Sequence, residues 1–302
     1  MKHLLSINDL SREDILELVS LAESLKLDRK FSNDLKNKNI ILLFEKPSLR
    51  TRVSFEVAIA ELNGKYYHLE GQAAGIGKRE AVKDIAKVLS RYVQACIIRT
   101  FKQADILEFS QYASIPVINA LTDLEHPCQI LSDLLTIKGK INRLSEFKIA
   151  FIGDGNNVSH SLIQAAAILG FDLSIATPSG YEPKDEILIP ALKKAEQTNA
   201  KINVSNNVQD AVKNADFIYT DVWTSMGQEK EKHLRKQIFK DFQINEQLLS
   251  SLSRKCYIMH CLPAHRGEEI TDKAVDSEHS IVIDQAENRL HMHKAILIKL
   301  FS

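Results

Sequence analysis

The sequence has few cysteines, no net charge and no long apolar run, and each shortage excludes a class of protein. Its four cysteines are too few and too irregularly spaced for a disulfide framework or a paired zinc site. Lys plus Arg and Asp plus Glu both number 39, so no overall field attracts the chain to nucleic acid or an anionic membrane. No apolar run approaches the roughly 20 residues of a membrane span. Any anion that the protein binds must therefore be held by a local site.

The N-terminal segment turns polar within a few residues and lacks the apolar core and small-residue cleavage site of a signal peptide. Together with the sparse cysteines, this predicts a cytoplasmic protein with reduced thiols. At 302 residues the chain exceeds a typical domain of roughly 100–200 residues, so we expect two domains of comparable size.

Short β-branched and aliphatic runs alternate with amphipathic stretches along the whole chain, which predicts parallel sheets crossed by helices. In the first half we expect strands at 40–44, 66–69, 96–99 and 116–119, and helices at 11–27, 53–62, 79–93, 104–112 and 126–138. In the second half we expect strands at 148–152, 173–176, 202–204, 217–219, 257–259 and 281–283, and helices near 230–240 and at 285–300. The predicted fold class is α/β, with two doubly wound domains that each have a central parallel sheet flanked by helices.

The expected domain boundary is a polar segment, Gly139-Lys140-Ile141-Asn142-Arg143, with a glycine where a helix would end. It separates a domain at 1–140 from one at 141–284, followed by a helix at 285–302. Because ligands bind at the carboxyl ends of the strands in open parallel sheets, the expected active site is the interdomain cleft.

A candidate phosphate site follows the first predicted strand, where Ser48-Leu49-Arg50-Thr51-Arg52 leads into a helix. A helix N-terminus offers backbone N–H groups and a positive dipole end, and the hydroxyls and arginines add donors. The competing interpretation is an ordinary helix cap, because capping alone explains a serine and a threonine here.

A second candidate segment, His126-Pro127-Cys128-Gln129, opens a helix directly after the predicted strand 116–119. A histidine in such a place is usually structural. Beside a phosphate loop, however, His126 could donate to a carbonyl oxygen and Gln129 could hold an amide group.

The turn Gly153-Asp154-Gly155-Asn156-Asn157 follows a strand and superficially matches the dinucleotide-binding fingerprint. It lacks the third glycine, and the next strand ends at Ala176-Thr177-Pro178 without the acidic residue that would hold a ribose. An NAD site is therefore disfavoured, and what remains is a turn able to direct Asn157 toward a ligand.

Two later strand ends carry further polar groups. The segment from Asp221 through Ser225 and Met226 to Gly227 could bind an amino-acid headgroup, although a capped turn would be the preferred interpretation if the segment stood alone. Cys261 follows His260, which suggests a nucleophile, but a small buried cysteine is common and no paired metal-ligand spacing accompanies it. Arg289, at the start of the last helix, adds one more cation.

In this order and at these separations, the segments resemble the aspartate/ornithine carbamoyltransferase family, and within it the ornithine-specific members, along nearly the whole chain. The resemblance implies transfer of the carbamoyl group of carbamoyl phosphate to the δ-amine of L-ornithine, giving L-citrulline and phosphate in arginine metabolism. It also implies no cofactor or metal, a homotrimer or a multiple of trimers, a carbamoyl-phosphate domain followed by an ornithine domain, and a final helix that packs back on the first.

The resemblance implies a role for each site residue. The expected ligands of carbamoyl phosphate are Ser48, Leu49, Arg50, Thr51, Arg99, His126, Gln129 and Arg289, with the backbone carbonyls of Cys261 and Leu262. The expected ligands of ornithine are Asn157, Asp221, Ser225 and Met226. The expected catalytic residues are Arg50 and His126, which stabilise developing charge, and Cys261 with Asp221, which orient the amine and help accept its proton.

Two positions depart from the family pattern. Leu49 stands where the loop usually has threonine, which removes one hydroxyl and keeps the backbone N–H. Gly75 stands where many members have glutamine, so it is not counted as a ligand.

Three other interpretations compete with this one. A carbamoyltransferase for putrescine, aspartate or an N-acylated ornithine is disfavoured by the Asp221-to-Gly227 segment and the His260-Cys261 pair. A non-catalytic binding protein should have lost groups on the reacting side. A dinucleotide-dependent dehydrogenase is disfavoured by the broken glycine fingerprint.

Overall fold

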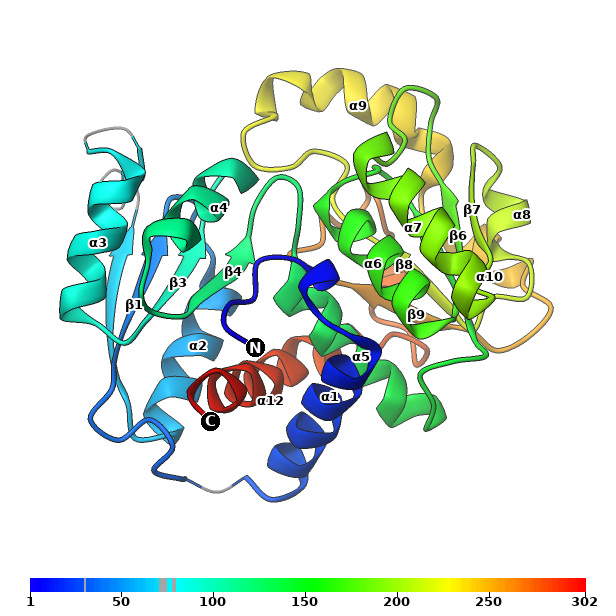
Figure 1. Ribbon diagram of the computed structural model, residues 1–302. Coiled ribbons are helices and arrows are strands. Elements are labelled where there is room, and N and C mark those ends of the chain that lie inside the picture. The colour runs from blue at the N-terminus through cyan, green and yellow to red at the C-terminus, as the bar shows by residue number, and fades with distance from the viewer. Residues whose placement is uncertain (30, 71–74, 78–79) are drawn as a thin grey trace. The chain divides into compact units, whose positions relative to one another are not determined.

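The computed structural model describes residues 1–29, 31–70, 75–77 and 80–302, which form two compact units (Figure 1). Unit 1 comprises Met1–Leu135 and Glu287–Ser302, and unit 2 comprises Thr136–Ala286. The chain leaves unit 1 within helix α5 (Pro127–Ile141) and returns to it within helix α12 (Val282–Phe301). No helix among the described residues is long and apolar enough to cross a membrane.

The sheet of unit 1 is parallel and has the strand order β2-β1-β3-β4. Its strands are β1 (Asn39–Phe44), β2 (Lys65–Glu70), β3 (Ala95–Arg99) and β4 (Val117–Leu121). Its helices include α1 (Arg12–Leu27), α2 (Leu49–Glu61), α3 (Val82–Tyr92) and α4 (Gln103–Tyr112), with a short 3-10 helix at Ile7–Asp9. The central strands β1 and β3 are nearly continuous aliphatic runs because helices cover both faces of such a sheet. The strand order reverses between them, so their carboxyl ends flank the switch point where ligands bind.

Unit 2 repeats this plan with the strand order β7-β6-β5-β8-β9, again all parallel. Its strands are β5 (Lys148–Ile152), β6 (Asp172–Ala176), β7 (Ile202–Ser205), β8 (Phe217–Thr220) and β9 (Tyr257–His260). Its helices include α6 (Asn157–Leu169), α7 (Asp185–Thr198), α8 (Val208–Val212), α9 (Lys232–Phe239), α10 (Glu246–Ser250) and α11 (Asp272–Val275). The switch point lies between β5 and β8, so the turns after these strands are neighbours.

The predicted α/β class, with two parallel sheets flanked by helices, is confirmed. The predicted location of the active site in an interdomain cleft stays a prediction. In unit 1, α2 begins at Leu49 rather than at 53 because Ser48 caps it. The helix expected at 79–93 begins at Val82, and Arg79 lies outside the described residues.

The predicted strand at 281–283 is wrong, because α12 begins at Val282. A single ladder step forms there: Ile258 N–H donates to the His279 carbonyl and Ile281 N–H donates to the Ile258 carbonyl, both at 2.9 Å. At the next step, the side-chain oxygen of Gln285 accepts from His260 N–H at 2.9 Å. A helical side chain thus replaces the next backbone acceptor, and tertiary context overrides the β-propensity of the Ile-Val-Ile run.

Candidate active site

The first turn of α2 stands at the switch point of unit 1, directly after β1. The Ser48 hydroxyl accepts from Thr51 N–H at 3.3 Å, and the Ser48 carbonyl accepts from Arg52 N–H at 3.0 Å. Capping therefore occurs, as the competing interpretation of this loop required. It leaves the loop suited to an anion, because the first N–H groups of a helix have no acceptor within it. Leu49 is 74% exposed, and because its side chain has no hydrogen-bond donor, its contribution to an anion site is its backbone N–H.

Helix α12 adds Arg289 to the same region of unit 1. Its guanidinium, which is 3% exposed, donates to Gln129 Oε1 at 2.5 Å and to Thr51 Oγ1 at 3.1 Å. The Gln129 amide in turn donates to Asp133 Oδ1 at 2.8 Å. Three residues that the sequence had placed together, from α2, α5 and α12, are thus joined by hydrogen bonds.

A histidine that was not predicted from the sequence, His293, contacts this cluster. Arg289 Nε lies 3.4 Å from His293 Nε2, and His293 Nδ1 lies 3.0 Å from the Ser54 hydroxyl, which donates to the Arg50 carbonyl at 2.6 Å. The His293 ring stacks on Phe55 with centroids 3.6 Å apart. Burial and Arg289 hold the pKa of His293 well below its ordinary value of 6.5, so the ring is neutral and can accept from the guanidinium.

His126 is buried beside several cations. Burial first, and then the positive charges of Arg289, Arg99 and Lys46, hold the pKa of His126 well below 6.5. Arg99 ends β3 and is 8% exposed, while Lys46 is 3% exposed, pairs with Asp123 and lies 4.4 Å from the Phe101 ring centroid. Unit 1 therefore concentrates positive charge around a neutral imidazole, although the chain as a whole has no net charge.

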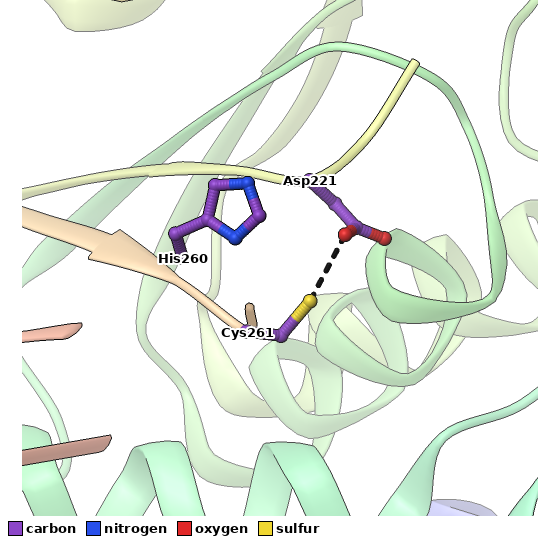
Figure 2. Close-up of side chains that lie close together, drawn as sticks. All are labelled: Asp221, His260 and Cys261. Carbon is purple, nitrogen blue, oxygen red and sulfur yellow. Dashed lines mark hydrogen bonds between the residues drawn. The ribbon is translucent and has the colours of Figure 1, made fainter. Parts of the chain in front are cut away.

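Asp221 is the centre of the candidate site in unit 2, directly after β8 (Figure 2). Its Oδ2 accepts from Asn156 Nδ2 at 2.7 Å, and its Oδ1 accepts from the Cys261 thiol at 2.9 Å. Asn156 also caps α6, accepting from Val158 N–H at 3.0 Å. The side chain that reaches Asp221 from the β5 turn is thus Asn156, one residue before Asn157, which stands in the first turn of α6.

Asp221, His260 and Cys261 offer ligand atoms within 4.8 Å of one another, so the trio must be tested as a metal site. His260 Nδ1 accepts from Leu262 N–H at 2.8 Å, which leaves the proton on Nε2, 3.0 Å from the buried Glu269 Oε1. Both ring nitrogens are thus committed, and a metal would have to displace one of these bonds. We assign no metal here. The Cys261 thiol donates to the Asp221 carboxylate, an arrangement that holds the thiol in place beside the carboxylate.

The remaining predicted residues of unit 2 lie on loops. Ser225 N–H donates to Gln228 Oε1 at 3.1 Å, and the Ser225 carbonyl accepts from Gln228 N–H at 3.0 Å. The next residue, Met226, is 42% exposed. Leu262 has a φ of 56°, in the left-handed region that a side chain disfavours. Strain of this kind is typical of functional positions.

Comparison with known proteins also divides the chain near residue 140, although the second family match extends through the final helix, which packs with unit 1. Residues 2–139 match the family model described as aspartate/ornithine carbamoyltransferase, carbamoyl-P binding domain, and residues 145–300 match the one described as Asp/Orn binding domain. The chain is 50% identical to an ornithine carbamoyltransferase of Archaeoglobus fulgidus over 99% of its own length and 97% of the relative's. The structure of ornithine carbamoyltransferase from Pyrococcus furiosus superposes with a TM-score of 0.95, at 44% identity and covering 98% of this chain and 96% of that one.

An anabolic ornithine carbamoyltransferase from Campylobacter jejuni gives a TM-score of 0.94, at 41% identity and covering 99% of each chain. Full-length similarity at this level, in sequence and in structure, leaves one conclusion. The chain belongs to the aspartate/ornithine carbamoyltransferase family.

Proposed function

We propose that this chain is an ornithine carbamoyltransferase, which moves the carbamoyl group of carbamoyl phosphate to the δ-amine of L-ornithine and releases L-citrulline and phosphate. The observation that carries the proposal is the pair of sites with complementary chemistry. Unit 1 has a buried cationic cluster at a helix N-terminus, and unit 2 has a carboxylate joined to an amide and a thiol. Relatives along the full length of the chain are ornithine carbamoyltransferases.

In this proposal, unit 1 binds carbamoyl phosphate. The first turn of α2, with the Ser48 and Thr51 hydroxyls, the Leu49 N–H and the Arg50 side chain, holds the phosphate together with Arg99 and Arg289. Gln129 holds the carbamoyl amide, since its Oε1 has a second lone pair beside the one that Arg289 uses. The backbone carbonyls of Cys261 and Leu262 are proposed to accept from the same amide.

Unit 2 in this proposal binds ornithine by its α-carbon end. Asp221 receives the α-ammonium group, and Asn157, Ser225 and Met226 complete the contacts to the headgroup. Asn156 becomes a positioning residue, because its amide holds one oxygen of Asp221 in place.

The chemistry is direct acyl transfer. The neutral δ-nitrogen forms a bond to the carbonyl carbon, the bond from that carbon to the phosphate oxygen breaks, and the nitrogen loses one proton. Arg50 and the neutral His126 stabilise charge on the carbonyl oxygen and the leaving phosphate. Cys261 and Asp221 orient the amine and help accept its proton. No covalent enzyme intermediate is needed.

The test is an assay of citrulline formation with carbamoyl phosphate and, in turn, ornithine, putrescine, aspartate or N-acetylornithine. Ornithine is expected to be the preferred acceptor by orders of magnitude. Preference for another amine would replace the proposed substrate within the family, and absence of turnover with all four would leave a binding protein.

We also propose a homotrimer, or a multiple of trimers, located in the cytoplasm. Strand β2 is an edge strand whose Tyr67 and Leu69, on one face, are 53% and 40% exposed and whose Tyr66, on the other, is 42% exposed, and an exposed apolar edge favours burial against another subunit. None of the four cysteines is in a disulfide, which agrees with a reducing compartment. Light scattering after size exclusion, applied to the wild type and to Tyr67→Lys, tests the assembly.

A further inference from the structure

Arg235, on α9, connects the loop that follows Asp221 to the turn after β5. The side chain is 6% exposed. Its Nη1 donates to the Trp223 carbonyl and to Asp154 Oδ2, both at 2.9 Å. Its Nε donates to Glu231 Oε2 at 2.9 Å. One guanidinium thus joins a backbone atom two residues after Asp221 to a carboxylate of the neighbouring strand end.

The loop that begins at Asp221 is therefore tied to the β5 turn at two points. Asn156 holds the Asp221 carboxylate directly, at 2.7 Å. Asp154 holds the Trp223 carbonyl through Arg235. The two attachments lie on either side of Val222, so together they fix both the position and the direction of the segment that leads to Ser225.

The turn that carries Asp154 and Asn156 has little room to move. Gly155 N–H donates to the Tyr181 carbonyl at 2.8 Å, and a Cβ on Gly155 would lie 2.3 Å from Pro183 N. The Tyr181 ring also lies under the guanidinium of Arg235, 4.8 Å from Cζ to the ring centroid. A cation over an aromatic face is attracted to it, so the same segment restrains Arg235 and the turn.

We propose that Arg235 is a positioning residue for ornithine: it ties the Trp223 carbonyl to Asp154 and so holds the Asp221-to-Ser225 segment in its binding position. The inference rests on the proposed function of unit 2. Arg235 itself touches no reacting atom, so its loss should weaken the use of ornithine and leave the binding of carbamoyl phosphate unchanged.

The electrostatics of the pair agree with this role. Burial raises the pKa of Asp154 to about 6, and Asp221 and Glu231 add to the rise, while Arg235 opposes it. Asp154 is thus ionised at neutral pH and can accept a charge-assisted bond, and it gains a proton as the pH falls through about 6.

The first test compares Arg235→Met with Lys236→Met. Methionine keeps an apolar stem to pack on Tyr181 and removes the donors. We expect Arg235→Met to raise the KM for ornithine about tenfold or more, with less than about a twofold change in the KM for carbamoyl phosphate. Lys236 lies on the same helix, is 45% exposed and pairs with Glu268, so Lys236→Met should change neither constant.

The second test needs no substrate, because Trp223 is the single tryptophan of the chain and stacks on Phe239, with centroids 5.9 Å apart. Its fluorescence therefore reports on this loop and on its contact with α9. We expect the emission of the wild type to change as the pH falls through about 6, and that of Asp154→Asn to stay constant there. The double variant Asp154→Asn/Arg235→Met should be no worse with ornithine than Arg235→Met, because the two side chains act as one unit.

Three results would overturn the inference. They are an unchanged KM for ornithine in a folded Arg235→Met, an equal loss for both substrates, and a fluorescence change near pH 6 that persists in Asp154→Asn. If Arg235→Met does not fold, Asp154→Asn still decides by its KM for ornithine. A wild type that makes no citrulline would contradict the proposed function. The fluorescence titration tests the link from Asp154 through Arg235 to the Trp223 carbonyl independently of turnover.

Discussion

The sites of unit 1 and unit 2 stand at the same topological point of two similar sheets but carry opposite charge. In unit 1 the switch point gathers Arg99, Arg289 and Lys46 around a helix N-terminus. In unit 2 it gathers two carboxylates, Asp154 and Asp221, with a single arginine that is shared with Glu231. The comparison teaches that a net charge of zero can conceal two strong local sites, one for an anion and one for a cation.

The two sites also differ in how they are held. The cations of unit 1 depend on α12, whose Arg289 comes from 160 positions beyond Gln129 in the sequence. The carboxylates of unit 2 stand at the ends of two strands that are neighbours in the sheet, β5 and β8, and Arg235 of α9 contacts Asp154.

The largest effect is expected from removing the carboxylate of the acceptor. Putrescine lacks the α-carboxylate, so kcat/KM for putrescine should fall on the order of 10⁴-fold below that for ornithine, because polar groups of the site stay unpaired. Asp221→Ala should impair both amines, because both carry the ammonium group that Asp221 is proposed to receive, and Asp210→Ala, on the exposed face of α8, should impair neither. Comparable kcat/KM values for both amines in the wild type would show that unit 2 does not read the headgroup.

Next in size is the loss of a cation from unit 1. Arg50→Ala should lower kcat about 10²- to 10³-fold, as expected when a donor to developing negative charge is removed. Arg52→Ala is the matched control, because Arg52 pairs with Glu56 at 2.9 Å on the surface of α2. Circular dichroism should show both variants folded. Near-normal turnover in Arg50→Ala would end the assignment of this loop to phosphate.

A smaller effect is expected from Cys261→Ala. Losing the 2.9 Å contact to Asp221 should reduce kcat/KM for ornithine about tenfold, since one such bond is worth about 1–1.5 kcal/mol. The KM for carbamoyl phosphate should stay constant, because the proposed contact to that substrate is the backbone carbonyl. Cys256→Ala serves as the control. A carbamoyl-cysteine at residue 261, detected by mass spectrometry, would make the thiol a nucleophile instead.

The smallest effect concerns stability. His126 and His293 have pKa values held well below 6.5 in the folded protein. As the pH falls below 6.5, these two residues therefore bind protons in the unfolded chain but remain neutral in the folded protein. Stability present above pH 6.5 is therefore lost as the pH falls, by up to about 1.4 kcal/mol per pH unit for each residue. His293→Phe keeps a ring to stack on Phe55 and should flatten this decline.

The measurement is the free energy of unfolding in urea at pH 7.5, 6.5 and 5.5 for wild type and variant. An identical slope in both would show that His293 does not titrate differently on folding. Burial and the charge of Arg289 would then not lower the pKa of this ring.

Much of the fold follows from local pattern. The buried runs of β1, β3 and β5 are nearly uninterrupted aliphatic segments, and their strands form where expected because parallel strands bury both faces. The run at 281–283 has the same composition and becomes helix, since the acceptor that meets His260 N–H is the side chain of Gln285. That contact cannot be predicted from the composition of the run.

The candidate site was predictable to the extent that its residues stand in motifs at strand ends, as Ser48, Thr51, Gln129 and Asp221 do. Residues that support them were missed for two reasons. Asn156 differs from Asn157 by a single position at the start of α6, and only the capping geometry separates them. Arg235 and His293 stand on helices with no motif, and each contacts a residue distant in sequence, Asp154 for Arg235 and Ser54 for His293.

The position of α12 has a consequence for the order of synthesis. Within unit 1, Lys294 donates to the buried Glu61 at 3.0 Å, and Arg289 completes the contacts of Gln129 and Thr51. These cations are translated after all of unit 2, although domains generally fold as they emerge from the ribosome. A nascent unit 1 therefore carries Glu61 in its interior without that lysine until residue 294 is available, while unit 2, continuous in sequence, can fold first.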